Sequence, residues 1–245
     1  RVSRGLGDVY KRQVKNIYCT IKYTCCSLMM SMAVTVGVAQ EKIADRLNTP
    51  AALENMKMRG LWSQSKNAAG ALLDYSFRYA SADLEYRFYD GNFRRPQQGE
   101  SGNNVVFDTE GGGKVKDFFA WGSFNYSRDK VKEANFNSSI IDPYRGMPYY
   151  TADTNVSNWN NQHYRLKMRV ATPQFWNFLS FGLDGYYQNS VGAKQRDMRT
   201  KSVFYTIIVR PGVVLSAGKN HRFGLDFEYA SVREDLEMKA VNSYV

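Results

Sequence analysis

Polar and apolar side chains alternate along residues 162–171, QHYRLKMRVA, and this pattern constrains the fold more than any other in the sequence. One parity carries His163, Arg165, Lys167 and Arg169, and the other carries Tyr164, Leu166, Met168 and Val170. A period of two residues is that of a β-strand whose faces meet different surroundings. In a soluble sheet the apolar face packs on a core. In a membrane barrel it meets lipid, and the charged face lines a lumen.

Similar segments occupy most of the chain after residue 83, so the sequence predicts an all-β fold. The segments with strand character are residues 84–88, 105–107, 118–127, 162–171, 179–188, 201–213 and 222–232. Several run for 10 to 13 residues, whereas soluble strands average about 5 to 6 residues and a tilted membrane-spanning strand needs about 9 to 11. Length therefore favours an antiparallel transmembrane β-barrel, of which about seven or eight strands are present.

Long and short connections alternate between these strands. Long polar connections are expected at residues 90–103, 132–157 and 189–200, and tight turns at residues 110–113, 172–174 and 216–220. Outer-membrane barrels show this rhythm because their periplasmic turns are short and their external loops are long. Seven spanning strands would be an odd number, and single-chain bacterial barrels have even numbers. The barrel is therefore expected to be incomplete, with further C-terminal strands missing from the sequence.

The N-terminal part has a different character. Residues 1–13, RVSRGLGDVYKRQ, resemble a translated sequencing-adapter read and are expected to be an artefact of a metagenomic reading frame. Residues 14–39 have the positive charge, the apolar run and the small residues that a cleaved secretory signal needs; the alternative for the apolar run is a buried core helix. Residues 40–65 are a predicted periplasmic or lumenal lead-in, with a short helix that starts at Pro50 and ends near Gly60. Residues 66–245 are the predicted partial barrel, which begins with a bulged or non-spanning strand at residues 73–79.

Composition excludes several classes of protein. Half of the net charge of +10 lies before residue 40, and the rest of the chain holds 27 basic and 22 acidic side chains. This excess is too small and too scattered to indicate nucleic-acid binding. All three cysteines also precede residue 40, so the predicted barrel holds neither a disulfide nor a cysteine-bound metal. Aromatic residues make up 14% of the chain, which suits a barrel with aromatic girdles and equally an aromatic-rich soluble β protein.

Two segments resemble known outer-membrane proteins. Residues 61–70 read LWSQSKNAAG and residues 90–99 read DGNFRRPQQG. Together they resemble an uncharacterised family of Gram-negative outer-membrane β-barrels, a domain of unknown function. Residues 67–70, NAAG, are also similar to the start of long-chain fatty-acid transport barrels, which carry a small N-terminal hatch. The resemblance covers about residues 40–245. It implies a barrel but no catalytic residue, because the first family has no assigned reaction.

Catalytic chemistry has little support in the sequence. No spacing typical of a serine hydrolase, a zinc protease or a phosphate-binding loop occurs. A hydrolase would need His163 beside a serine and a carboxylate from other strands, with Asp184, Asp226 and Glu228 as candidates. The alternative is that His163 is one polar side chain among several. We predict that the chain is not an enzyme and that it holds no cofactor and no metal.

The charged parities of the strands carry the predicted functional surface. A charge that faced lipid at mid-bilayer would cost about 2 to 4 kcal/mol, so in a barrel these side chains are expected to face the lumen. The predicted lumen-lining residues are His163, Arg165, Lys167, Arg169, Asp184, Arg222, Asp226 and Glu228. They would form ion-pair ladders or a pore wall; the alternative is that they merely fill a narrow barrel.

The sequence therefore predicts an outer-membrane β-barrel of a Gram-negative bacterium, exported through a cleaved signal peptide. Its predicted role is porin-like or facilitated passage of an unidentified solute. The alternatives are a non-transporting barrel that serves structure, adhesion or assembly, and a secreted soluble β-sheet binding protein. The expected partners are the outer-membrane lipid and that solute, with no nucleic acid. The oligomeric state is left open.

Overall fold

A computed structural model describes residues 50–74, 78–140, 149, 151–194, 196, 198–218 and 221–240. The predicted signal at residues 14–39, residues 1–13 and residues 40–49 of the predicted lead-in lie outside the described residues. The chain divides into two compact units, Arg1–Glu54 and Asn55–Val245. The second unit holds all the described strands.

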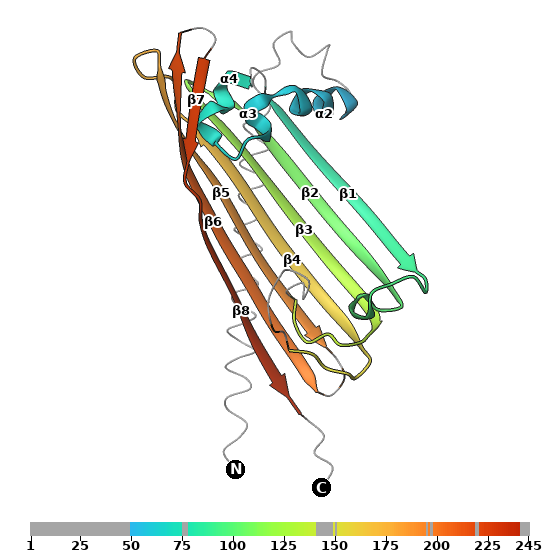
Figure 1. The fold of residues 1–245 in the computed structure, drawn as a ribbon. Helices are drawn as coiled ribbons and strands as arrows, with labels where there is room; N and C mark the ends of the chain where they lie inside the picture. Colours follow the sequence, from blue (N-terminus) through green and yellow to red (C-terminus); the bar gives the residue numbers. More distant parts are fainter. Residues whose placement is uncertain are drawn as a thin grey trace, which may run out of the picture. The chain divides into compact units, whose positions relative to one another are not determined.

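Eight antiparallel strands form a single sheet in this unit (Figure 1). They are β1 (Tyr79–Asp90), β2 (Ser101–Val115), β3 (Phe118–Ala134), β4 (Ser157–Ala171), β5 (Leu179–Lys194), β6 (Arg199–Ala217), β7 (His221–Asp226) and β8 (Tyr229–Lys239). Strands that are adjacent in sequence are adjacent in the sheet from β1 to β7, and β8 pairs with β6. The predicted all-β antiparallel fold is confirmed. In the described part of the chain β1 pairs with neither β7 nor β8, so the sheet is open.

The central strands are long because the alternating pattern continues beyond the segments where it is clearest. β3, β5 and β6 have 17, 16 and 19 residues, about three times the average for strands of soluble proteins. β4 contains the whole alternating segment 162–171. β5 extends to Lys194, so residues 189–194 belong to a strand and not to the long connection that the sequence predicts there.

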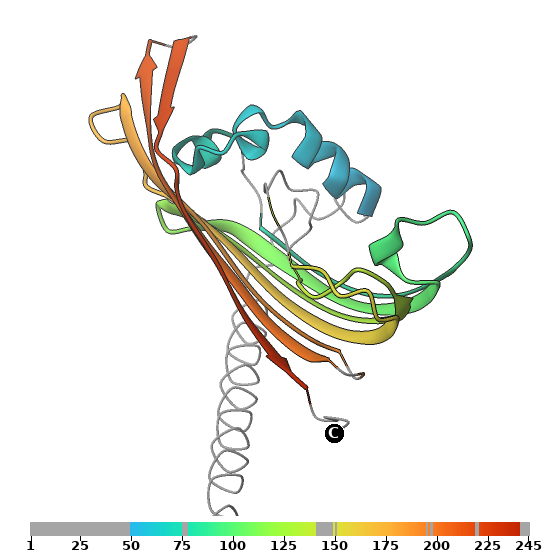
Figure 2. The same ribbon diagram turned by 60° about the horizontal axis from the view of Figure 1, so that its bottom comes forward.

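Short helices lie on one face of the sheet, which we call the inner face; the opposite one is the outer face (Figure 2). They are α3 (Leu61–Gln64), η3 (Ala68–Gly70) and α4 (Ala71–Asp74), and η3 packs on β4, β5 and β6. We refer to residues 61–74 as the docked segment. The longer helix α2 (Pro50–Arg59) starts and ends where the sequence predicts, and η4 (Pro96–Gln98) lies in the connection between β1 and β2. Among the described residues, no helix is both long and apolar enough to cross a membrane.

The predicted strand at residues 222–232 is divided in two by a proline on its neighbour. β7 pairs with β6 from Gly212 onwards and β8 pairs with it up to Val209, and both pairings follow one register. That register places Pro211 opposite Phe227. The Pro211 carbonyl accepts a hydrogen bond from the Phe227 N–H at 3.0 Å, but the proline nitrogen has no proton to donate in return. β7 and β8 therefore follow one continuous path beside β6, and they are separated only where the hydrogen bond from residue 211 to the Phe227 carbonyl is missing.

The tight turn predicted at residues 110–113 is wrong. β2 continues through these glycines to Val115, and the chain reverses at residues 116–117, where Lys116 has a φ of 55°. Gly112 is accommodated within the strand because the Trp121 ring occupies the space above it: a Cβ atom there would lie 2.7 Å from Trp121 Cδ1. Gly112 therefore serves packing on the inner face, and the run of glycines does not reverse the chain.

The strand predicted to begin at residue 73 is also wrong in its first part. Residues 71–74 are helical, residues 75–77 lie outside the described part, and β1 begins at Tyr79. Leu73 packs on a buried cluster formed by Trp62, Ala69 and Val214. This tertiary packing, which local alternation does not reveal, stabilises a helical turn there.

Candidate functional site

Glycines on the inner face form a seat for the docked segment. Gly182 and Gly212 are cross-strand partners on β5 and β6, and Gly224 lies on β7. A Cβ atom at Gly182 would lie 2.1 Å from the Ala69 nitrogen, and one at Gly212 would lie 2.3 Å from Asn67 Oδ1. Real Cβ atoms do not approach other atoms so closely. The segment therefore reaches the strands only because these positions carry no side chain.

Hydrogen bonds hold the docked segment in this seat. The buried Asn67 side-chain amide donates to the carbonyls of Val213 and Leu225, at 3.1 Å each. Its oxygen accepts from the Ala69 N–H at 2.9 Å, and Ser180 Oγ donates to the Ala69 carbonyl at 3.0 Å. A buried amide without such partners would be costly. The hydrogen bonds to Val213, Leu225 and Ala69 therefore allow the Asn67 amide to be buried on the inner face.

Charged side chains of alternating sign cross the inner face next to the seat. Arg169 on β4, Asp184 on β5 and Arg210 on β6 are successive cross-strand partners, and the register places Glu228 opposite Arg210. The Asp184 carboxylate accepts from Arg169 Nε and from Arg210 Nη1, both at 2.7 Å. Glu228 Oε2 accepts from Arg210 Nε at 2.6 Å. We call these four residues the charge row.

The charge row also binds the docked segment. The Arg169 guanidinium donates to the carbonyls of Ser63 and Ser65, at 2.9 Å each. At the other end, Lys66 Nζ lies 3.3 Å from Glu228 Oε2. One nitrogen of the Arg169 guanidinium thus donates to Asp184 of the sheet, and the other two donate to the docked segment. The planar group holds its donors in a fixed fork that permits this geometry. The docked segment and the inner face of the sheet are therefore joined by one network of hydrogen bonds and ion pairs.

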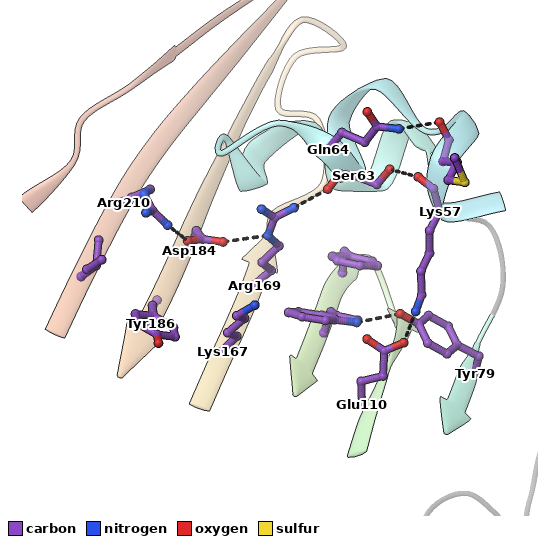
Figure 3. A pocket seen from close by; sticks show the side chains of 15 residues that line it. Lys57, Ser63, Gln64, Tyr79, Glu110, Lys167, Arg169, Asp184, Tyr186 and Arg210 are labelled. Carbon is purple, nitrogen blue, oxygen red and sulfur yellow. Dashed lines mark hydrogen bonds and ion pairs between the residues drawn. The ribbon is translucent and has the colours of Figure 1, made fainter. Parts of the chain in front are cut away.

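A cavity of about 760 Å³ lies between the inner face and the chain near residues 57–64 (Figure 3). On one side it is bounded by the ion pair between Lys57 and Glu110. Nearby, Trp121 Nε1 donates to the Tyr79 hydroxyl at 2.7 Å, reaching across Gly112, which has no side chain to block it. The volume is in the range of small-molecule sites, which is about 300 to 1,000 Å³.

Further along β4, polar side chains contact the neighbouring strands. Arg165 Nη1 donates to Asn125 Oδ1 at 2.8 Å, and Asn125 Nδ2 donates to Asp108 Oδ2 at 2.7 Å. His163 lies between Asp129, at 3.0 Å from its Nε2, and Ser190, whose Oγ is 2.7 Å from its Nδ1. These contacts tie β2, β3, β4 and β5 together across the inner face.

The order Asp129, His163, Ser190 has the connectivity of a nucleophile triad. However, Ser190 has no exposed surface, and its hydroxyl also accepts from Gln188 Nε2 at 3.0 Å. A substrate therefore has no access to this oxygen. We interpret the three side chains as cross-strand polar contacts that satisfy one another.

The predicted lumen-lining residues fall into three groups in the structure. Arg169, Asp184 and Glu228 meet in the charge row. His163, Arg165 and Lys167 share their face but lie further along β4. Arg222 and Asp226 are exposed and make no hydrogen bond or ion pair within the described residues. The prediction missed Arg210, although its even position within residues 201–213 already sets it opposite the apolar parity of that strand.

The connection between β3 and β4 forms a second set of contacts at the far end of the strands. The Glu234 carboxylate on β8 accepts from Ser139 Oγ, at 2.7 and 2.9 Å, and from the Ile140 N–H at 2.9 Å. Asp153 forms an ion pair with Lys194, whose side chain is fully buried. Burial raises the pKa of Asp153, but Lys194 and the Asn155 N–H lower it more, so the net pKa lies below the ordinary value of 3.8. These contacts hold the described parts of the connection against β5 and β8.

The outer face is apolar where the inner face is charged. On β6, seven successive outward positions carry only apolar side chains or tyrosine: Val203, Tyr205, Ile207, Val209, Pro211, Val213 and Leu215. On β4, Leu166, Met168 and Val170 are 41 to 47% exposed, and the Tyr164 ring lies 5.1 Å from the Tyr126 ring, centroid to centroid. Exposed apolar side chains thus follow one another on neighbouring strands, and soluble monomers rarely expose large contiguous apolar patches.

The sequence model of one family, described as a family of unknown function (DUF6850), matches residues 68–245. No curated protein and no solved structure matches the chain. The family match begins inside the docked segment and covers the whole sheet. Its description names neither a barrel nor a transporter, so the expected likeness to fatty-acid transport barrels is not part of it.

Proposed function

We propose a function for this chain, which belongs to that family of unknown function, from the chemistry of the two faces of its sheet. The sheet forms part of the wall of an outer-membrane β-barrel, its outer face meets lipid, and its inner face borders a path for a solute. The observation that carries the proposal is the contrast on β6, where Ile207 and its outward neighbours are apolar while Arg210 on the inner face is charged and paired.

The apolar stretch of β6 has the length that a bilayer requires. The twelve residue steps from Val203 to Leu215 span about 40 Å at about 3.3 Å per residue. A strand tilt of about 40 to 45° reduces this to about 30 Å, close to the apolar band of about 25 Å that outer-membrane barrels present. At one end the stretch is followed by Lys201, whose outward charge suits the membrane surface.

Aromatic side chains gather at the other end of the stretch. The connection between β4 and β5 and the residues beside it carry Phe175, Trp176, Phe178 and Phe181, all more than 40% exposed. The Trp176 and Phe178 rings are stacked, with centroids 6.0 Å apart. Exposed aromatic rings at the ends of spanning strands are typical of the membrane–water interface, where an amphipathic ring is favoured.

The docked segment favours a second candidate function. Residues 61–74 occupy part of the inner face. They are held there by the hydrogen bonds of their own Asn67 to the sheet and by those of Arg169 in the charge row. A barrel whose lumen held this segment permanently would not transport and would serve structure, adhesion or assembly. The two functions differ in whether the segment can leave the wall.

Conductance in planar bilayers tests both. We expect the refolded full-length protein to show heat-modifiable gel mobility and to form channels, and Arg169→Gln to raise conductance because it frees the carbonyls of residues 63 and 65. Arg222→Gln is the matched control, since Arg222 is an exposed inner-parity arginine without a partner among the described residues. Channels in neither protein would favour the non-transporting barrel, and solubility without detergent would exclude the membrane proposal.

A further inference from the structure

We infer that the cavity beside the charge row binds a small organic anion, a carboxylate on an aromatic or similarly flat body, and that Lys167 binds its carboxylate. The inference rests on the proposed function, because it takes the inner face as the surface that a solute meets. The cavity, the free charge of Lys167 and the surrounding apolar side chains carry it together.

Lys167 lacks a partner where its neighbours have one. It lines the cavity on β4, between Arg165, which binds Asn125, and Arg169, which binds Asp184. The Lys167 side chain is exposed and makes no hydrogen bond or ion pair within the part of the chain that the structure describes. Figure 3 shows its ammonium beside the charge row, with no interaction drawn to it.

The charges of the cavity leave an excess of positive charge. Its lining has four cations, Lys57, Lys167, Arg169 and Arg210, and two anions, Glu110 and Asp184. Lys57 pairs with Glu110, and the two arginines are balanced by Asp184 and by Glu228, which binds Arg210 from outside the lining. The excess is therefore the single charge of Lys167. A concave site with this imbalance attracts an anion and repels a cation. The ammonium of Lys167 is the point at which the anion is bound directly.

The apolar part of the lining fits a flat body. Tyr186 is the cross-strand partner of Lys167, and Ile208 is the partner of Tyr186. Trp121, on β3, lines the cavity on the other side of β4. The Trp121 N–H is bound by Tyr79, and the Tyr186 hydroxyl donates to Gln188 at 2.6 Å. Their polar atoms are thus occupied, and the rings offer apolar surface within reach of the ammonium.

Equilibrium dialysis of the detergent-solubilised full chain against benzoate tests the site, with benzamide as the neutral ligand of the same shape and protein-free micelles as the blank. We expect benzoate to bind at least about tenfold more tightly than benzamide, since a charge-assisted hydrogen bond contributes about that factor or more. Lys167→Gln should abolish the difference between the two ligands.

Two further variants separate loss of the site from loss of the fold. Ser123→Asp places a carboxylate opposite Lys167 on β3 and should neutralise the ammonium in place, again abolishing the preference for benzoate. Lys201→Gln removes a lysine from the outer parity of β6, outside the cavity lining, and should leave benzoate binding unchanged. Equal binding of benzoate and benzamide by the unsubstituted protein would overturn the inference.

Ion selectivity in planar bilayers distinguishes failure of this inference from failure of the proposed function. Anion preference in a salt gradient that Lys167→Glu reverses would support both. If the protein forms channels that do not prefer anions, and if it does not bind benzoate, the inferred anion site is wrong and the proposed solute path still stands. Benzoate binding without any channel would support the site and overturn transport.

Discussion

Side-chain volume at individual positions of the inner face decides whether residues 61–74 can dock. The Cβ positions of Gly182 and Gly212 fall on atoms of the docked segment. Glycine within a strand normally weakens it, because it gains no packing and loses more entropy on folding. Here the cost is offset by contact between two backbones, so these glycines are structural residues.

A methyl group at Gly182 should displace the segment. In Gly182→Ala the new Cβ meets the backbone of Ala69 at 2.1 Å, which cannot move aside as a flexible side chain would. We expect cleavage by trypsin after Lys66 to become at least about tenfold faster, as the segment opens more often. Gly122→Ala is the control, because its Cβ would make only an ordinary 3.7 Å contact with the Lys167 carbonyl. Equal acceleration of cleavage in both variants would contradict the role of Gly182 in seating the docked segment.

Asp184 carries more of the stability of the wall than its exposed neighbours do. Its side chain is 9% exposed and is bound by two arginines. Asp184→Asn leaves Arg169 without a charged partner and leaves Arg210 with Glu228 alone. We expect the free energy of unfolding to fall by about 2 kcal/mol, measured by guanidinium titration in detergent. Asp226→Asn, exposed and without a partner among the described residues, should change it by less than about 0.5 kcal/mol. Similar losses in the two variants would mean that the charge row adds nothing.

At the scale of elements, the connection between β3 and β4 should respond to acid. The pKa of Asp153 is held below 3.8 by Lys194 and the Asn155 N–H, which outweigh the effect of burial. A carboxyl with a depressed pKa contributes stability that is complete above its ordinary value and is lost as the pH falls through the lowered one. Hydrogen exchange of residues 138–140 and 151–156, corrected for intrinsic rates, should therefore stay slow at pH 5 and increase below about pH 3.8. Asp153→Asn should show fast exchange at both pH values, and an acid step retained in that variant would assign it to another group.

The elements themselves could be predicted from alternation, but several of their ends and interruptions could not. Residues 162–171 are a strand because every position obeys a period of two. By contrast, β2 passes through three glycines that look like a turn, since the space above Gly112 is filled by Trp121 from another strand. The break between β7 and β8 comes from Pro211, a residue of β6. In both cases the cause lies on a neighbouring strand, and local pattern carries no information about it.

The candidate site could be predicted only in part, again because local pattern carries no information about neighbouring strands. Parity identified Arg169, Asp184 and Glu228 as inner-face charges. The prediction missed Arg210, although the same rule applied to β6 would have included it. Parity did not indicate that Asn67 meets Val213, 146 residues away, or that Arg222 and Asp226 lack partners. Which charges meet depends on strand order and register, and those emerge only from the assembled sheet.

At the scale of the whole molecule, adjacent residues of β6 should tolerate charge differently. Ile207 points outward and Ile208 lines the cavity on the inner face. If the outer face meets lipid, Ile207→Arg should destabilise the inserted protein by about 2 to 4 kcal/mol, whereas Ile208→Arg should fold and insert. Urea titration of protein refolded into lipid vesicles measures both. In a soluble sheet Ile207→Arg would be harmless, and that result would contradict the membrane proposal.

The seat of the docked segment has a consequence for the order of folding. Its two halves are far apart in the chain: Ser180 binds Ala69 across 111 residues, and Arg169 binds Ser63 across 106. The glycine surface exists only after β5, β6 and β7 have found their register, and contacts of such high sequence separation form late because of the loop entropy they require. The docked segment leaves the ribosome before the strands that it docks on, and it is therefore the last of these parts to reach its native position. The onset of its protection from protease would mark the completion of the sheet.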